Sequence, residues 1–259
     1  MESEIEGTLK DKVTIITGAG SGIGRACAKL LFSQRSKVVL VEFNPDSLKN
    51  VMAELEAIGD AENILSLQMN VCRETDMNEM ANQTLLRFGR IDNLIASAGI
   101  LRISGTLKTV VETSLEEWQA VIQTNLTGTF LSNRAVLPVM IAQKQGDIIN
   151  ISSVSGRQGR AFDAPYCASK FGIIGLSESI AEEVAAYGVR VQTILPDSVD
   201  TPLWDQNGVK SIKAPVTIPA ERVAELILYL LRLPKDAYLL NPVIAPFKGR
   251  KKRSKLKDV

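Results

Sequence analysis

The stretch VTIITGAGSGIGRACAKLL, residues 13–31, contains a short apolar run, a glycine-rich turn and a segment whose apolar residues have helical spacing. This order predicts a buried strand that leads through a tight turn into a helix. Such a turn presents backbone N–H groups and the positive end of the helix to an anion. Its pattern is T-G-x-x-x-G-x-G, from Thr17 through Gly18, Gly22 and Gly24. No Lys-Ser/Thr pair follows, which argues against a nucleotide-hydrolysing P-loop. We predict a phosphate-binding turn, with a purely structural turn as the alternative.

Strand-like and helix-like segments alternate along the rest of the chain. A helix is expected to begin between residues 217 and 221, and a last strand to lie within 237–247. The other strand-like runs are residues 13–17, 37–42, 64–69, 93–97, 147–152 and 190–195. This alternation predicts a parallel sheet with helices on both faces, that is, an α/β fold with a single doubly wound Rossmann-type domain.

Composition fits one ordinary globular domain, because 45% of the 259 residues are hydrophobic and the net charge is +1. These values exclude a disordered chain and a wholly basic nucleic-acid-binding protein. The charge is uneven, since residues 248–259 hold seven Lys or Arg against Asp258, which leaves about −5 for the body. We expect a domain over residues 1–247 and a separate, mobile basic tail over 248–259.

The cysteines and the first residues indicate a compartment. Three cysteines are odd in number and lack metal-ligand spacing, and the chain starts with a charged rather than an apolar segment. No apolar run approaches the ~18 residues that a membrane span needs. We therefore expect a cytoplasmic protein and no metal.

Glu42 ends the second predicted strand, eighteen residues after Gly24. In dinucleotide-binding turns an acid near this offset accepts hydrogen bonds from the adenosine ribose. A carboxylate there would repel a 2′-phosphate, and neither Ser21 nor Phe43 supplies a compensating cation. The sequence thus favours NAD over NADP. The alternative is a solvated glutamate at a strand end.

The sequence PYCASK, residues 165–170, places Tyr166 and Lys170 four residues apart in a chain without histidine. On a helix these side chains share a face. An ammonium ~5 Å away would lower the phenol pKa by about two units at an effective dielectric constant near 20. Tyr166 is then a candidate proton carrier. A simple helix-surface pair is the alternative.

Ser153, thirteen residues before Tyr166, and Asn125 in TNLTGTF complete a specific pattern with TGAGSGIG. Together these motifs resemble the short-chain dehydrogenase/reductase family over roughly residues 8–245. The resemblance implies that Tyr166 is the general acid/base and that Lys170 lowers its pKa and holds the nicotinamide ribose. It also implies that Ser153 polarises the substrate oxygen and that Asn125 supports a water relay.

The same resemblance implies the positions that contact the cofactor NAD. They are Gly18, Ser21, Gly22, Ile23, Gly24, Glu42, Phe43, Asn70, Val71, Ala98, Gly99, Tyr166, Lys170, Pro196, Val199 and Thr201. The chain departs from the family at ASAG, residues 96–99, where Asn-Asn-Ala-Gly is usual, and at Asn70, where Asp is usual. Asp197 replaces a common glycine, and either senses the nicotinamide charge or merely tolerates the backbone conformation.

Several loop residues bear on the substrate without identifying it. Phe162, Leu203 and Trp204 are either pocket walls or packing residues. Arg102, Arg157 and Arg160 either meet an anionic substrate or are solvated.

The resemblance implies an NAD(H)-dependent oxidoreductase that acts on a secondary alcohol or ketone of sugar, polyol, cyclic alcohol or 3-oxoacyl type, and a homotetramer. The alternative is a non-catalytic NAD-dependent binding protein whose basic tail contacts nucleic acid or an acidic membrane.

Overall fold

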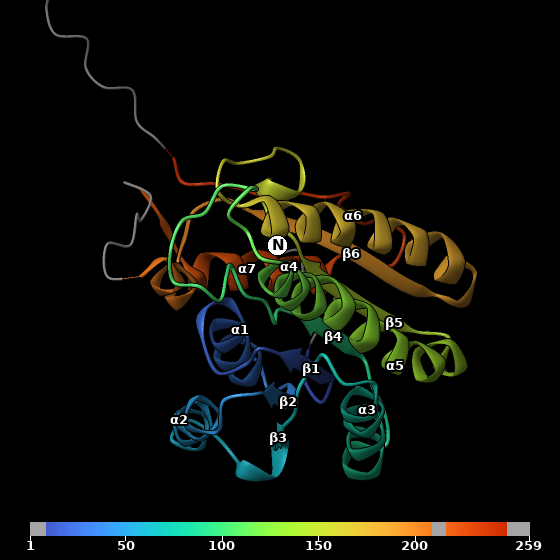
Figure 1. The fold of residues 1–259 in the computed structure, drawn as a ribbon. Coiled ribbons are helices and arrows are strands. Elements are labelled where there is room, and N and C mark those ends of the chain that lie inside the picture. Colours follow the sequence, from blue (N-terminus) through green and yellow to red (C-terminus); the bar gives the residue numbers. More distant parts are fainter. Residues whose placement is uncertain (1–8, 209–215, 248–259) are drawn as a thin grey trace, which may run out of the picture.

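A seven-stranded parallel sheet forms the centre of the molecule (Figure 1). The computed structural model describes residues 9–208 and 216–247. The order across the sheet is β3-β2-β1-β4-β5-β6-β9. Its strands are β1 (Val13–Thr17), β2 (Lys37–Glu42), β3 (Ile64–Gln68), β4 (Asn93–Ala96), β5 (Gly146–Ile151), β6 (Val189–Pro196) and β9 (Val243–Ile244). The predicted strands, including the last one, are confirmed.

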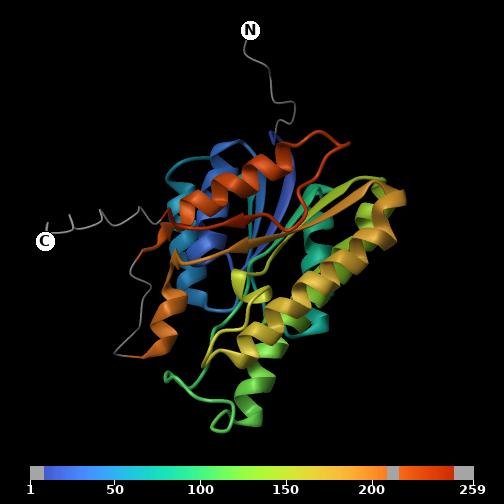
Figure 2. The same cartoon turned by 90° about the horizontal axis from the view of Figure 1, so that it is seen from above.

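Helices cover both faces of this sheet, as the alternation of segments predicted. One layer contains α1 (Gly22–Ser33), α2 (Pro45–Glu56) and α7 (Ala220–Arg232). The other contains α3 (Glu74–Phe88), α4 (Leu115–Ile122), α5 (Gly128–Gln143) and α6 (Ala164–Val184). The two layers are separated by the sheet in the second view (Figure 2). The doubly wound Rossmann-type prediction is confirmed.

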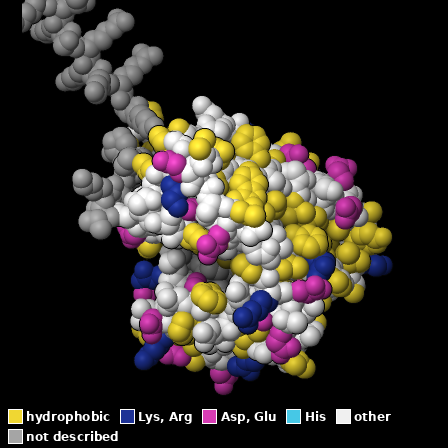
Figure 3. Space-filling model, in the orientation of Figure 1, with side chains coloured by type: hydrophobic (Ala, Val, Ile, Leu, Met, Phe, Trp, Pro, Cys, Tyr) yellow, Lys and Arg dark blue, Asp and Glu magenta, His cyan; other side chains and the backbone are white. Residues whose placement is uncertain are grey.

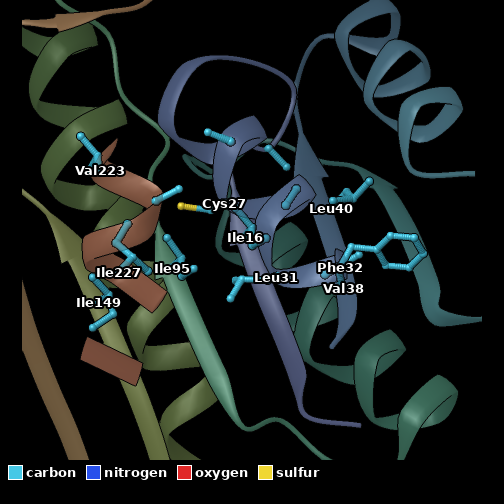
Figure 4. Packing of buried hydrophobic residues seen from close by; sticks show 14 of the residues in the cluster. Ile16, Cys27, Leu31, Phe32, Val38, Leu40, Ile95, Ile149, Val223 and Ile227 are labelled. Carbon is cyan, nitrogen blue, oxygen red and sulfur yellow. The ribbon is translucent and has the colours of Figure 1, made fainter. Parts of the chain in front are cut away.

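Two hydrophobic cores result from the alternation of side chains along the strands. Val38 and Leu40 of β2 pack into the core under α1, α2 and α7, whereas Val39 and Val41 pack into the opposite core. All four are fully buried. Figure 4 shows part of the first core, with Cys27 of α1 among apolar side chains of the sheet and of α7. Strands buried on both faces read as unbroken apolar runs, which is why they were predictable.

The order of the strands reverses between β1 and β4. The chain builds β1, β2 and β3 outward in one direction, and then β4, β5, β6 and β9 in the other. Loops that leave the carboxyl ends of β1 and β4 therefore diverge and open a crevice, which is where sheets of this kind bind ligands.

Three local features were not predicted. A single π-helical turn, Gln123–Thr127, joins α4 to α5. A two-stranded sheet pairs β7 (Val199–Asp200) with β8 (Ile218–Pro219), and a short 3₁₀ helix, Pro202–Asn207, follows β7. The predicted basic tail, 248–259, lies outside the described residues. No helix in the described ranges combines the length and the apolar character needed to cross a bilayer.

Candidate active site

A cavity of about 940 Å³ opens at the carboxyl ends of the strands. It lies at the upper end of the size range of small-molecule sites. Its walls come from the turn after β1, the end of β2, and the loops that follow β3, β4, β5 and β6. Every predicted cofactor position lines this cavity except Gly24. Ser153, Tyr166 and Lys170 line it as well, whereas Asn125 does not.

The glycine turn forms one end of the cavity. Gly18 has φ +65°, and a Cβ there would lie 2.8 Å from Ala98 Cα. Gly22 also has a positive φ, and it is the first residue of α1, where the backbone N–H groups lack partners within the helix. Gly24 packs so closely that a Cβ would lie 2.1 Å from the Gly18 carbonyl oxygen. The absence of a Cβ at Gly24 therefore allows close packing behind the turn, whereas Gly18 and Gly22 line the cavity. A bound diphosphate group requires such an open turn.

Glu42 is held in place by the backbone. Its Oε1 accepts hydrogen bonds from the N–H groups of Phe43 and Asn44, each at 2.9 Å, and its Oε2 accepts one from Gly20 at 3.1 Å. The carboxylate is half-buried and lines the cavity. The carboxylate is thus held at the cavity by backbone N–H groups, and its contact with a ribose stays a prediction.

Asn70 stabilises its own loop while it lines the cavity. Its Oδ1 accepts a hydrogen bond from Cys72 N at 2.9 Å. A carbonyl oxygen accepts two hydrogen bonds, so one position remains for a ligand donor. On the opposite side, Pro196, Val199 and Thr201 line the cavity at the end of β6 and at β7.

Tyr166 lies in the first turns of α6 and is hydrogen-bonded to the side chain of Ser153. Burial raises the pKa of Tyr166 to about 12, and the Ser153 hydrogen bond opposes this shift. The nearby charge of Asp163 raises the pKa further, and Arg160 lowers it. The predicted net depression of the Tyr166 pKa is thus wrong for the cofactor-free protein, because desolvation is the largest cause and Lys170 is not among the groups that lower the pKa. Tyr166 is therefore protonated at neutral pH.

Lys170 is buried on the same face of α6, with its Nζ 5.5 Å from the centre of the Tyr166 ring. The Nζ donates a hydrogen bond to the Ile151 carbonyl oxygen at 2.8 Å. Desolvation lowers the pKa of Lys170 to about 8. Lys170 lines the cavity, so the other N–H groups of its ammonium can donate hydrogen bonds to a ligand.

Asn125 lies inside the π-helical turn and is completely buried. Its Oδ1 accepts from Ile100 N at 2.8 Å, and its Nδ2 donates to Ile100 O at 2.9 Å and to Ser169 Oγ at 3.0 Å. It therefore fixes the loop after β4 against α6 from behind the cavity wall. This geometry makes Asn125 a positioning residue, and its participation in a water relay stays a prediction.

The buried ammonium of Lys170 gives a test by stability. Between its folded pKa of about 8 and the ordinary value of 10.5, the unfolded state binds more protons, so the unfolding free energy rises with pH. We expect the cofactor-free wild type to gain about 1 kcal/mol relative to Lys170→Met between roughly pH 7 and pH 9. Urea unfolding at both pH values measures this difference. An equal change in both proteins would show that the pKa of Lys170 is not lowered in the folded protein.

Comparison with known proteins identifies the family of this chain. A family model described as short chain dehydrogenase matches residues 12–210, which is more than half of the chain. The chain belongs to the short-chain dehydrogenase family. It is 36% identical over 235 residues to a 3-oxoacyl-acyl-carrier-protein reductase of Synechocystis sp., with 89% of this chain and 93% of that protein covered. A second such reductase, from Thermotoga maritima, is 33% identical over 243 residues. The match covers 91% of this chain and 96% of that protein.

A solved structure agrees in fold. The crystal structure of levodione reductase superposes with a TM-score of 0.82 at 30% identity, and covers 91% of this chain and 96% of that one. Members of the short-chain dehydrogenase family are oxidoreductases that use a nicotinamide cofactor. The glycine turn and the acid at the end of β2 fit such a dinucleotide, as described above.

Two ion pairs in the cavity wall were missed by the sequence analysis. Arg102 pairs with Asp163, and Arg160 pairs with Asp197 at 3.1 Å. Asp197, where the family commonly has glycine, thus binds a cation of the loop before α6. Of the three arginines predicted either to meet an anionic substrate or to be solvated, Arg102 is buried. Sequence gave no signal for these pairs, because their members are far apart in the chain and meet only in the folded loops.

Proposed function

We propose that this short-chain dehydrogenase transfers a hydride between NAD(H) and a secondary alcohol or ketone. The main support for the proposal is that the proton-transfer residues and Glu42 line the same cavity. The hydrogen-bonded pair of Ser153 and Tyr166 lines its reactive part, and the fixed carboxylate of Glu42 lines the part formed by the glycine turn and β2.

The nicotinamide cofactor supplies or accepts the hydride when it is bound. Tyr166 is protonated at neutral pH, so it can donate a proton to the oxygen of a ketone as the hydride arrives. Ser153 can donate a hydrogen bond to the same oxygen, where negative charge develops. In the oxidative direction Tyr166 accepts the proton. The Ser153 hydrogen bond, which stabilises the phenolate, favours that step.

A panel assay tests this function. The purified protein is mixed with NAD⁺ and secondary alcohols, or with NADH and ketones, from the cyclic, polyol and 3-oxoacyl classes. The absorbance of the reduced nicotinamide reports turnover. We expect turnover with at least one class. NADH oxidation that is equal with and without every ketone would refute the proposal.

We further propose that the protein is a homotetramer in a reducing cytoplasm. The described cysteines are unpaired. Figure 3 shows hydrophobic side chains gathered over α4, α5 and α6, where Trp118, Phe130 and Phe171 are each more than a third exposed. Such apolar faces are typical of subunit interfaces. Light scattering coupled to gel filtration measures the mass, and a monomer at micromolar concentration would exclude this assembly.

The basic tail is expected to be dispensable for catalysis. Its seven cations are accompanied only by Leu256 and Val259 as apolar residues, so it offers little to pack against the domain. We expect deletion of residues 249–259 to change kcat/KM less than about twofold. Steady-state kinetics checks this expectation. Salt-dependent binding of RNA, DNA or anionic vesicles by the full chain alone would instead favour the binding-protein alternative.

A further inference from the structure

Phe162 has an unusual backbone conformation in the wall of the cavity. Its φ is +68°, in the left-handed region, which is rare for a bulky side chain because of steric crowding. The other described residues with a positive φ that are not glycine do not line the cavity; they are Asp11, Arg35, Lys144 and Asn241. Strained residues of this kind cluster at functional sites. The conformation of Phe162 therefore points to a role in the cavity.

Ion pairs on both sides of Phe162 hold this conformation. Arg160, two residues before it, pairs with Asp197 at the end of β6. Asp163, directly after it, pairs with Arg102 of the loop that follows β4. The Asp163 N–H also donates to the Arg160 carbonyl oxygen at 3.4 Å and so closes a turn around Phe162. These contacts with two other walls of the cavity offset the steric cost of the left-handed backbone.

The side chain of Phe162 is accessible to a ligand. Phe162 lines the cavity and is 49% exposed. It precedes Tyr166 by four residues, just before the start of α6, so it belongs to the end of the cavity where the proton is transferred. An aromatic ring exposed to water gains free energy when apolar surface covers it.

Other apolar side chains line the same end of the cavity. Val154 directly follows Ser153, and the rest come from the loop after β4 and from the 3₁₀ helix after β7, namely Leu101, Leu107, Leu203 and Trp204. For Phe162, Leu203 and Trp204 the sequence left open whether they are pocket walls or packing residues, and all three are in the cavity wall. A substrate with an apolar body can bury these surfaces.

The large polar side chains at this end are engaged with the protein. Arg102 and Arg160 are paired with Asp163 and Asp197, so their charges are neutralised. The Oε1 of Gln206 accepts hydrogen bonds from two backbone N–H groups of the loop after β4, at 2.7 and 3.2 Å. A polyhydroxylated substrate loses hydrogen bonds to water on entry and needs several new partners, whereas an apolar ring or chain needs none.

We propose that Phe162 determines specificity by selecting secondary alcohols and ketones whose reacting carbon carries a hydrophobic ring or chain. This inference rests on the proposed oxidoreductase function and deepens it, because it excludes the sugars and polyols among the substrates considered above. The strained backbone fixes the ring of Phe162 as one wall of the pocket.

Thermal unfolding tests the strain independently of turnover. Phe162→Gly and Phe162→Ala both remove the ring, but only glycine adopts a positive φ without steric cost. We expect the cofactor-free Phe162→Gly protein to melt at least about 2 °C above Phe162→Ala. Circular dichroism measures both transitions. Equal melting temperatures would show that the backbone of Phe162 is not strained and would overturn this part of the inference.

Homologous ketones test the specificity. One series is 4-methyl-, 4-ethyl- and 4-propylcyclohexanone, and the other is methyl 3-oxoalkanoates with acyl chains that lengthen by one CH₂ at a time. The carbonyl group is unchanged within a series, so only the apolar body grows. In the wild type kcat/KM should rise about fourfold for each CH₂ that becomes buried. Comparing this rise between proteins cancels general damage to the enzyme.

Variants assign the rise to Phe162. In Phe162→Gly we expect a rise of less than about twofold for each CH₂, whereas Phe162→Leu, which keeps an apolar side chain, should retain most of it. Phe247→Ala removes an exposed ring outside the cavity and should leave the rise unchanged. The same rise in the wild type and in Phe162→Gly would overturn the assignment to Phe162.

Polar analogues separate the remaining outcomes. The wild type should prefer 4-methylcyclohexanone to 4-hydroxycyclohexanone, which is of similar size, and the opposite preference would overturn the inference. Turnover confined to polyhydroxylated ketones such as dihydroxyacetone would also overturn it and leave the proposed function intact. If the wild type reduces no ketone of these series or of the earlier panel, the proposed function fails, and the inference fails with it.

Discussion

Tyr166→Phe is expected to lower kcat by about a thousandfold, within the range that general acid–base catalysis contributes. Phenylalanine keeps the ring but removes the hydroxyl that is hydrogen-bonded to Ser153. The dissociation constant of NADH should therefore change little. Steady-state kinetics measures the loss of turnover, and quenching of protein fluorescence measures NADH binding.

Tyr187 provides a control for the substitution of Tyr166. Tyr187 is half exposed, does not line the cavity and follows α6 in a short 3₁₀ turn. Tyr187→Phe should retain wild-type kcat. If Tyr166→Phe keeps kcat within about tenfold of the wild type at every pH, Tyr166 is not the proton carrier.

Glu42 is expected to make kcat/KM at least about a hundredfold higher with NADH than with NADPH. The ribose hydroxyls of NADH can donate charge-assisted hydrogen bonds to its carboxylate. The phosphate of NADPH would face that carboxylate, which the N–H groups of Gly20, Phe43 and Asn44 hold in place. The side chain could turn away only by breaking these three hydrogen bonds.

Variants at this position separate charge from shape. Glu42→Gln keeps the size of the side chain but removes its charge, and Glu42→Ala also releases three backbone N–H groups that can bind a phosphate. We expect both variants to lower the ratio of kcat/KM with NADH to kcat/KM with NADPH, and Glu42→Ala to lower it more. The double variant Glu42→Ala, Phe43→Arg should prefer NADPH to NADH. Equal kcat/KM for NADH and NADPH in the wild type would show that Glu42 does not face the ribose.

The sheet and the cofactor end of the site could be predicted because their signals are local. Strands such as Lys37–Glu42 are unbroken apolar runs, since both faces of the sheet are covered. The glycine turn shows the same locality, because Gly18 and Gly22 adopt positive φ values within a few residues of each other. The motifs that carry the family resemblance are local as well, and nearly all cofactor positions that the resemblance implies line one cavity.

Features that depend on the folded surroundings could not be predicted. Helical spacing brought Lys170 near Tyr166, but burial of the phenol, which raises its pKa, is a property of the assembled cavity. The π-helical turn around Asn125 is likewise stabilised by Ile100 and Ser169, which are distant in sequence. Arg102 lies in a polar loop, and only the loops packed around it reveal that it is buried.

Isotope transfer shows whether the hydride passes directly between the cofactor and the substrate carbon. The wild type is incubated with a ketone that it reduces and with NADH deuterated at the transferring position of the nicotinamide, and the alcohol product is analysed by mass spectrometry and NMR. We expect one deuterium on the carbinol carbon of each product molecule, with the hydroxyl proton derived from solvent through Tyr166. Product alcohol without deuterium at that carbon would contradict direct hydride transfer in this site.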